Sequence, residues 1–314
     1  MSQVLGYACI NMGLSERPKK QRITTNRSMI KRTFKQRGIR YASELALLNA
    51  RDLLKIVKWN HMNDIKLFRM SSGIFPWASE YDIKDLPDYN QIAAVLAETG
   101  AFAKQVGQRL TTHPDHFCKL TSPREHVITN TVRDLEIHGE LMDLLGMPRS
   151  HWAKINIHVG ATYGDKPMAI DNFCRNFDLL SDSVKSRLTV ENDDRDSLYS
   201  TAELVEKIYP RIGTPIVHDI HHHLFTNRGM SQDEAMGLAA GTWGDVTPVI
   251  HYSESRAKEH NDSKIRPQAH SDMIYDYINT YDHDVHIMIE AKHKELALLH
   301  YRNLHNKQLL TVAA

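Results

Sequence analysis

The stretch RLTVENDDRDSLYSTAELVEKIYPRIGTPIVHDIHH, residues 187–222, contains the pattern that decides the fold. An apolar, β-branched segment at 187–193 is followed by a segment of helical periodicity at 201–208 and a second apolar segment at 214–222. A strand, a helix and another strand in succession indicate parallel strands joined by a right-handed crossover.

The same alternation extends over the whole chain. We expect strands at residues 4–11, 65–72, 108–114, 153–160, 187–193, 214–222, 247–255 and 284–292. We expect helices at Ser43–Asn63, Tyr89–Val106, Pro123–Leu145, Ala169–Asp178, Thr201–Ile208, Gln232–Leu238 and Gln268–Thr280, and a tail helix at Ala291–Lys307. The polar segments 15–40 and 253–266 are expected to be long loops.

Eight strand–helix units predict an α/β fold of the (β/α)₈ TIM-barrel type. We expect a single domain over residues 1–314, with a C-terminal helical tail at about 291–314. An open doubly wound sheet is the alternative. It requires a glycine-rich phosphate turn after the first strand, and GYACINMG at residues 6–13 is not GxGxxG.

The composition is that of an ordinary globular protein, with 41% hydrophobic and 25% charged residues in 314. The 39 Lys and Arg and 38 Asp and Glu give a net charge of +1, so no global field attracts a polyanion. Residues 16–58 differ, with 13 cations against 3 acids. Such a run is usually a solvated surface, unless other features indicate nucleic acid.

The three cysteines, Cys9, Cys118 and Cys174, have no metal-binding spacing, which favours a reducing compartment. No apolar run reaches membrane-spanning length, and the N-terminus reads as a strand, not as a signal peptide. We therefore expect a cytoplasmic protein.

Polar side chains follow most of the predicted strands. A parallel barrel carries its active site at the C-terminal ends of its strands. Those ends supply Tyr7, Asn11, Arg69, Ser71, Ser72, His113, His158, Glu191, Asn192, Asp219, His222, His251 and Glu290, with His270 in the loop after the seventh strand. Histidine is also frequent, with 19 in the chain.

Imidazoles and carboxylates crowded at one rim are costly to bury unless cations compensate them. Mixed ligands of this kind suit Mn²⁺, Zn²⁺ or Fe²⁺, and eight are too many for one ion. Two or three ions with open positions are suited to in-line attack on a phosphodiester. Metal-assisted hydrolysis is therefore the leading reaction class, and a metal-dependent sugar isomerase or epimerase remains an alternative on spacing alone.

Several motifs together resemble the UV damage endonuclease family, called UvdE, or UvsE in bacteria. They are LGYACIN, TTNRS at 24–28, FRMSSGIFPWAS at 68–79, RLTTHPDHF at 109–117, IHVGATYGDK at 157–166, TVENDD at 189–194, HDIHHH at 218–223, IHYSES at 250–255, RPQAH at 266–270 and IMIEAKHKE at 287–295. They occur in family order and cover nearly the whole chain.

The resemblance implies a DNA repair endonuclease that cuts immediately 5′ of UV photoproducts and some other lesions in double-stranded DNA, leaving a 3′-hydroxyl. It implies a cluster of two or three divalent ions, usually Mn²⁺, with Zn²⁺ or Mg²⁺ as alternatives. We also expect a nucleoid-associated monomer that binds no membrane. A catalytically inactive DNA-binding relative is a third hypothesis.

Carried over residue by residue, the resemblance gives a ligand set that agrees with the strand ends: His113, His158, Glu191, Asp219, His222, His251, His270 and Glu290. Glu191, His251 and Glu290 are the expected catalytic residues. We expect one ion at His113, His158 and Glu191, a second at Glu191, Asp219, His251 and Glu290, and a third at His222 and His270. His221 or His223 is the alternative to His222.

The resemblance also implies residues that bind DNA. A wedge at His116 and Phe117 would fill the gap left by an extruded lesion, with Tyr7 and Asn11 near the flipped pair. Some relatives have Gln and Tyr at the wedge positions. Phosphate contacts are expected from the basic N-terminal loop and from Arg27, Arg69, Lys166, Arg256 and Lys292.

One position departs from the family pattern. Some relatives carry a lysine two residues before the histidine of the seventh strand, where this chain has Val249. Residues two apart in a strand share a face. We therefore expect a site with no lysine beside the metals.

Overall fold

The computed structural model describes residues 3–115 and 118–312. It contains one sheet of eight parallel strands in the order β6-β5-β4-β3-β2-β1-β8-β7. The strands are β1 Val4–Ala8, β2 Leu67–Met70, β3 Arg109–Thr112, β4 Ile155–His158, β5 Leu188–Glu191, β6 Ile216–Val217, β7 Val249–Tyr252 and β8 His286–Ile289. A parallel bridge between Asp219 and His251 joins the two outer strands. The predicted single-domain barrel is confirmed.

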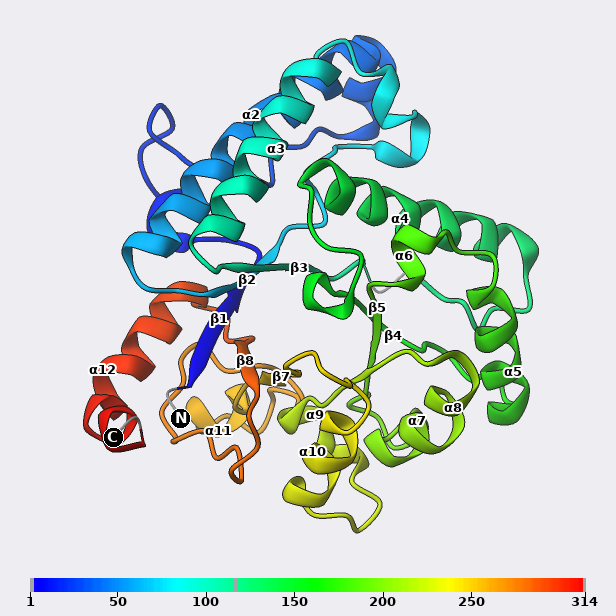
Figure 1. Ribbon diagram of the computed structural model, residues 1–314, viewed down its shortest axis with the longest axis vertical. Coiled ribbons are helices and arrows are strands. Elements are labelled where there is room, and N and C mark those ends of the chain that lie inside the picture. Colours follow the sequence, from blue (N-terminus) through cyan, green and yellow to red (C-terminus); the bar gives the residue numbers. More distant parts are fainter. Residues whose placement is uncertain (1–2, 116–117, 313–314) are drawn as a thin grey trace.

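Helices surround the strands in the arrangement seen in Figure 1. They are α1 Met12–Ser15, α2 Lys31–Met62, α3 Tyr89–Gln105, α4 Glu125–Leu144, α5 Lys166–Phe177, α6 Asp182–Lys185, α7 Thr201–Lys207, α8 Tyr209–Ile212, α9 Ile220–Thr226, α10 Gln232–Ala240, α11 Arg256–Glu259 and α12 Lys294–Val312. Three 3₁₀ turns lie at Ala78–Glu80, Ile83–Asp85 and His151–Ala153. In the described part of the chain, no helix is both long and apolar enough to span a membrane.

Local sequence signals explain where helices α7 and α10 begin. Ser200 and Ser231 each form a capping box with the glutamate three residues later, Glu203 and Glu234. Such boxes satisfy two free amide groups at once. Helix α7 follows β5, and α10 lies between β6 and β7. The capping boxes therefore fix where these two helices begin in the connections between the strands.

Arg109 closes the end of the barrel opposite the site. Its side chain is fully buried at the start of β3 and donates to the carbonyl oxygens of Trp152, His151 and Thr247. The guanidinium also lies 4.6 Å from the centre of the Trp152 ring. A buried cation needs such partners. This end of the barrel is therefore filled by side chains and closed to solvent around Arg109.

Two predicted helices differ from the structure. Helix α2 begins at Lys31, twelve residues before the predicted Ser43, and its chain bends at Gly38, where φ is 67°. The predicted helix at Gln268–Thr280 is wrong. Glutamate side chains accept the backbone amides there, Glu254 from Tyr275 and Asp276 and Glu259 from Asp272 and Met273.

The predicted sixth strand is shorter than expected. It ends at Val217, and the Asp219 side chain accepts the His222 amide at 2.7 Å and caps α9. His222 therefore lies in the first turn of a helix and not at a strand end. An aspartate before a helix is a common N-cap, but the apolar pattern at 214–222 concealed it.

Candidate metal centre

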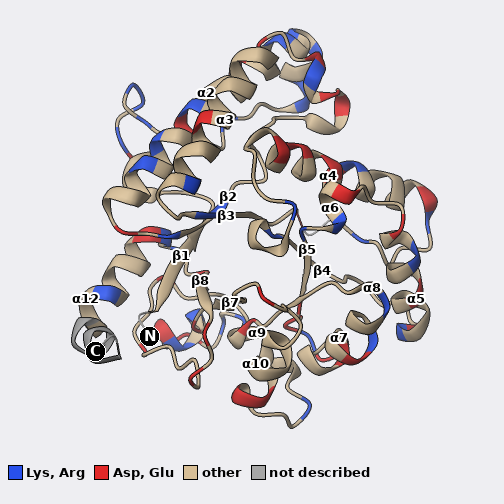
Figure 2. Cartoon of the chain, viewed as in Figure 1, with Lys and Arg blue, Asp and Glu red and all other residues tan. Residues whose placement is uncertain are grey.

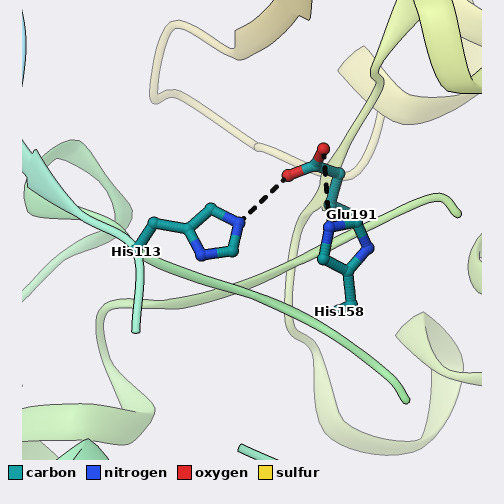
Figure 3. Close-up of side chains that lie close together, drawn as sticks. All are labelled: His113, His158 and Glu191. Carbon is teal, nitrogen blue, oxygen red and sulfur yellow. Dashed lines mark ion pairs between the residues drawn. The ribbon is translucent and has the colours of Figure 1, made fainter. Parts of the chain in front are cut away.

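Three strand ends bring together the first group of predicted ligands. His113 follows β3, His158 ends β4 and Glu191 ends β5. The Nε2 atom of His113 lies 3.6 Å from Oε2 of Glu191, and that of His158 lies 3.9 Å from Oε1 (Figure 3). One donor atom from each side chain lies within 4.8 Å of the others, which suits a single ion.

A second group shares Glu191 with the first. It joins Glu191, Asp219 and His251, again with one donor atom each within 4.8 Å. All three side chains are buried. Nδ1 of His251 lies 3.0 Å from Glu191 Oε2 and 3.0 Å from Glu290 Oε1, so Glu290 borders the same group. The carboxylate of Glu191 thus lies where it can bridge two ions.

His222 and His270 complete the cluster. Nδ1 of His222 is 3.3 Å from Glu191 Oε1 and 3.8 Å from Asp219 Oδ2, and Nδ1 of His270 is 3.7 Å from Glu290 Oε2. The rings of these two histidines are 5.8 Å apart. All eight predicted ligands therefore form one cluster at the rim of the barrel, linked by nitrogen–oxygen distances of 3.0–3.9 Å.

The neighbours of His222 have other surroundings. His223 contacts the Met230 carbonyl oxygen through Nε2 at 3.0 Å. His221 is buried and packs edge-on against the rings of Phe225 and His270. Of the three consecutive histidines, His222 alone forms a close pair with a ligand carboxylate among the described residues.

One atom of the cluster has no hydrogen-bond partner and so fits a cation. Asp219 Oδ2 is buried and accepts no hydrogen bond in the described part of the chain. A buried acceptor left unpaired costs about 1–3 kcal/mol. A divalent ion beside this oxygen and the Glu191 carboxylate would satisfy it.

The electrostatics of the cluster are unusual. Burial opposes the charge of Glu191, yet His251 and His158 beside it hold its pKa well below the usual value. Burial likewise opposes protonation of His158, but Glu191 and Asp193 raise its pKa to about 9. The pKa of His113 is lowered to about 4 by burial. Groups perturbed in both directions within one cleft are typical of a functional site.

Two buried asparagines hold Glu191 and Asp219, one through a carboxylate and the other through the backbone. Asn156 donates to Glu191 Oε2 at 2.5 Å, and its own oxygen accepts from the Thr189 hydroxyl. Asn192 accepts the Asp219 amide at 2.7 Å and donates to the Asp219 carbonyl oxygen at 3.1 Å. Outer partners of this kind fix the orientation of metal ligands. Asn156 was missed in the sequence, although it precedes His158 by two residues and so shares its face.

Contrary to expectation, a lysine does lie beside the cluster. Lys154 is fully buried, and its Nζ lies 3.0 Å from Nε2 of His251. Burial lowers its pKa to about 7. Lys154 directly precedes β4 and alternates with Asn156 and His158, so the three side chains point to the same face. Val249 indeed supplies no amine, but the expectation of a site without a lysine is wrong, because a different strand provides one.

Arg69 lies inside the cluster rather than at its edge. Its guanidinium is paired with the carboxylate of Glu290. Burial disfavours the charged guanidinium, but Glu290 raises its pKa. The side chain is 12% exposed, so a small part of it remains accessible to solvent.

Tyr7 and Asn11 are buried in this structure. The Tyr7 hydroxyl donates to Asn60 at 2.8 Å and accepts from the Asn11 side chain at 3.1 Å. Asn11 also caps α1 through the Leu14 amide. Contact of either residue with an extruded base would require this network to open. Their role at a lesion stays a prediction.

The other predicted DNA-binding residues fall into three groups. His116 and Phe117 lie outside the described residues. Lys166 is paired with Glu203 at 2.5 Å, and Arg27 with Asp52 at 2.6 Å, so both already have anionic partners. Arg256 also has an anionic partner, Asp272 at 3.3 Å, whereas Lys292 is exposed.

A cavity of about 350 Å³ opens beside the cluster. The predicted ligands His113, His158 and His222 form one wall. The rest of the lining includes Asp115, Cys118, Lys119, Asp193, Asp194, Arg195 and Leu198. It is large enough for a small planar group next to the ligands.

Comparison with known proteins identifies the family. The model of the family "UV-endonuclease UvdE" matches residues 3–312. The chain belongs to this family. It is 34% identical to the UV-damage endonuclease of Schizosaccharomyces pombe over 94% of this chain and 49% of that protein. It is 32% identical to the UV DNA damage endonuclease of Bacillus mycoides over 81% of this chain and 80% of that protein.

The lengths of these relatives differ. The chain spans about half the length of the S. pombe protein and 41% of the UV-damage endonuclease of Neurospora crassa, to which it is 35% identical. Among solved structures it is similar to SacUVDE, with a TM-score of 0.82 and 27% identity over 98% of this chain and 99% of that chain. A D-tagatose 3-epimerase-like protein has a TM-score of 0.56 at 12% identity, which shows a shared fold alone.

Proposed function

We propose that the protein is a divalent-metal-dependent DNA repair endonuclease. It hydrolyses the phosphodiester immediately 5′ of UV photoproducts in double-stranded DNA and leaves a 3′-hydroxyl. The observation that carries this proposal is the cluster of eight histidines and carboxylates at the barrel rim. Membership of the UvdE family supports the substrate.

The first ion would be held by His113, His158 and Glu191, and the second by Glu191, Asp219, His251 and Glu290, with His222 and His270 available to a third. Bound divalent ions supply a hydroxide nucleophile near neutral pH and neutralise the charge on the phosphate. Mn²⁺ is the proposed metal, since mixed imidazole and carboxylate ligands suit it. Glu191, His251 and Glu290 would be the catalytic residues because all three face the shared part of the cluster.

Arg69 and the buried asparagines would prepare the site for the phosphate. Asn156 and Asn192 keep Glu191 and the Asp219 backbone in place before substrate arrives. Arg69 pairs with Glu290 at the opening, where its guanidinium can also donate to a phosphate oxygen. Groups held in place beforehand need no reorganisation during the reaction.

Lesion recognition would use extrusion of the damaged nucleotides. A photoproduct stacks and pairs poorly, so its extrusion costs less free energy than that of normal bases. The cavity beside His113 and His158 is the proposed place for an extruded base. His116 and Phe117, which the sequence predicts as the wedge, stand between the lining residues Asp115 and Cys118 in the chain.

A nicking assay tests this function. Supercoiled plasmid, irradiated or untreated, is incubated with the protein and Mn²⁺, and the ends are mapped on a lesion-containing duplex. We expect cuts 5′ of the photoproduct with a 3′-hydroxyl, and loss of cutting in excess chelator. Equal cutting of both plasmids, or none, would contradict the proposal. Turnover of a ketose would favour the isomerase alternative.

A further inference from the structure

A short basic loop stands out from the barrel between α1 and α2. Its sequence is ERPKKQR, residues 16–22, with four cations and one acid. All seven residues are exposed. Figure 2 shows it as a protruding loop rich in blue. We call these residues the basic loop.

The stem of the basic loop is fixed, although its tip is exposed. The Ile23 amide donates to the Leu14 carbonyl oxygen at 3.1 Å and closes the loop, and the Gln21 amide donates to the Pro18 carbonyl oxygen at 2.7 Å within it. Before the loop, the buried Glu295 carboxylate accepts the amides at the start of α1 at 2.7 and 2.8 Å. The cations are thus carried on a defined turn.

The basic loop leaves the barrel at the same rim as the metal cluster. It follows the C-terminal end of β1, where the Cys9 amide donates to the Arg69 carbonyl oxygen at 2.7 Å. Downstream, Asn26 is hydrogen-bonded to Ser71, just after the end of β2. A ligand bound over Arg69 and Glu290 would therefore extend toward this loop.

The cations of the basic loop lack acidic partners. Within the described residues, none of Arg17, Lys19, Lys20 and Arg22 forms an ion pair, whereas some exposed cations on the outer helices do, as with Lys58 and Glu98 or Arg211 and Asp171. Four unpaired charges in six residues create a strong local field in a chain with a net charge of only +1. The ligand that fits them is a polyanion.

We propose that the basic loop binds the phosphate backbone of undamaged duplex beside the lesion. This inference rests on the proposed function, because it names where the substrate extends beyond the site. Contacts to phosphate fix the position of a protein on DNA without reading its sequence. The loop therefore contributes affinity and registration on the duplex, and not lesion preference.

Charge neutralisation tests the inference. The variant R17Q/K19Q/K20Q/R22Q is compared with the wild type for binding to irradiated and untreated 30-mer duplexes over a range of salt concentrations. Each lost phosphate contact lowers the slope of log K against log salt by about 0.9. We expect the salt dependence to become shallower, with the magnitude of the slope lower by about 2 to 4. Affinity should fall about tenfold or more, by the same factor for both duplexes.

Two further variants complete the experiment. The charge-preserving variant R17K/K19R/K20R/R22K should keep the wild-type slope, because counterion release depends on charge. K58Q/K104Q/K207Q/R211Q, which removes four charges from outer helices, should also keep it. An unchanged slope in the neutralised loop variant, or a loss confined to irradiated duplex, would overturn the inference. Failure of the wild type to cut irradiated DNA would instead refute the proposed function, since binding is measured without cutting.

Discussion

Replacing Glu191 with glutamine is expected to remove the ligand that both candidate ion groups share. Glu191 is 1% exposed, and its two oxygens lie 3.0–3.9 Å from nitrogen atoms of four histidines. Glutamine has nearly the same shape but no charge, and its amide nitrogen is a donor. One side of the site would therefore present a donor where an ion requires an oxygen.

The size of the effect follows from that position. Loss of an outer partner of a metal ligand costs roughly 10–100-fold in metal affinity or activity, and loss of a shared ligand should exceed that. We expect at least one bound ion fewer and a fall in kcat of about 10³-fold or more, equivalent to about 4 kcal/mol of transition-state stabilisation.

The assay combines metal analysis with cutting. Bound Mn²⁺ is counted by mass spectrometry after dialysis, and cutting of irradiated duplex is measured at saturating Mn²⁺. Glu203→Gln is the matched control, because Glu203 pairs with Lys166 and has no contact with the eight ligands among the described residues. Full metal content and wild-type kcat in Glu191→Gln would refute the bridging role, whereas loss in both variants would indicate a general effect on folding.

Three other outcomes are expected. Asn192→Ala should weaken Mn²⁺ binding 10–100-fold, because the Asp219 backbone loses two hydrogen bonds; Asn176→Ala, which loses a bond to the Leu120 carbonyl oxygen, should lower Tm without changing Mn²⁺ affinity. Lys154→Met should lower kcat about tenfold or more, because His251 loses the amine that contacts it, while Tm stays the same or rises, because a buried polar group is removed. A wild-type kcat would contradict a role of Lys154 in positioning His251. Metal-free Lys154→Met protein should lose Tm between pH 6.5 and 9: the raised pKa of His158, about 9, and the raised pKa of His222 contribute stability that is fully present below about pH 6.5 and is lost as the pH rises toward 9. The methionine background is needed because the lowered pKa of Lys154, about 7, makes the wild type gain stability as the pH rises over the same range. The lowered pKa of His113 acts below this window, and a constant Tm in metal-free Lys154→Met from pH 6.5 to 9 would contradict the prediction.

The fold could be predicted because its pattern is local. Each strand is a short apolar run, and each connection carries its own helix signal. The wrongly predicted helix lies where side chains from a distant part of the chain accept the backbone amides. The 268–280 segment reads as a helix, yet Glu254 and Glu259 accept its amides. Long-range contacts of this kind leave no periodic signal.

The clustering of the predicted ligands could be foreseen for a similar reason. The C-terminal ends of parallel strands meet at one rim, so His113, His158 and Glu191 needed only correct strand ends. His222 joins the same cluster although its local structure was predicted wrongly, because Asp219 caps a helix whose first turn brings His222 to the same carboxylate.

The groups behind the ligands were harder to find. Lys154 contacts His251 across the barrel, 97 residues away in the chain. The sequence of β7 has Val249 and no amine, and it does not indicate that Lys154, next to β4, contacts His251. Only the closed barrel brings these two strands face to face.

The most direct test of the central claim is anomalous diffraction from crystals grown with Mn²⁺, measured on both sides of the Mn absorption edge. Two or three peaks should appear among the eight side chains, with Glu191 bound to two of them. Crystals containing ordered Mn²⁺ elsewhere but none between Glu191, Asp219 and His251 would contradict it.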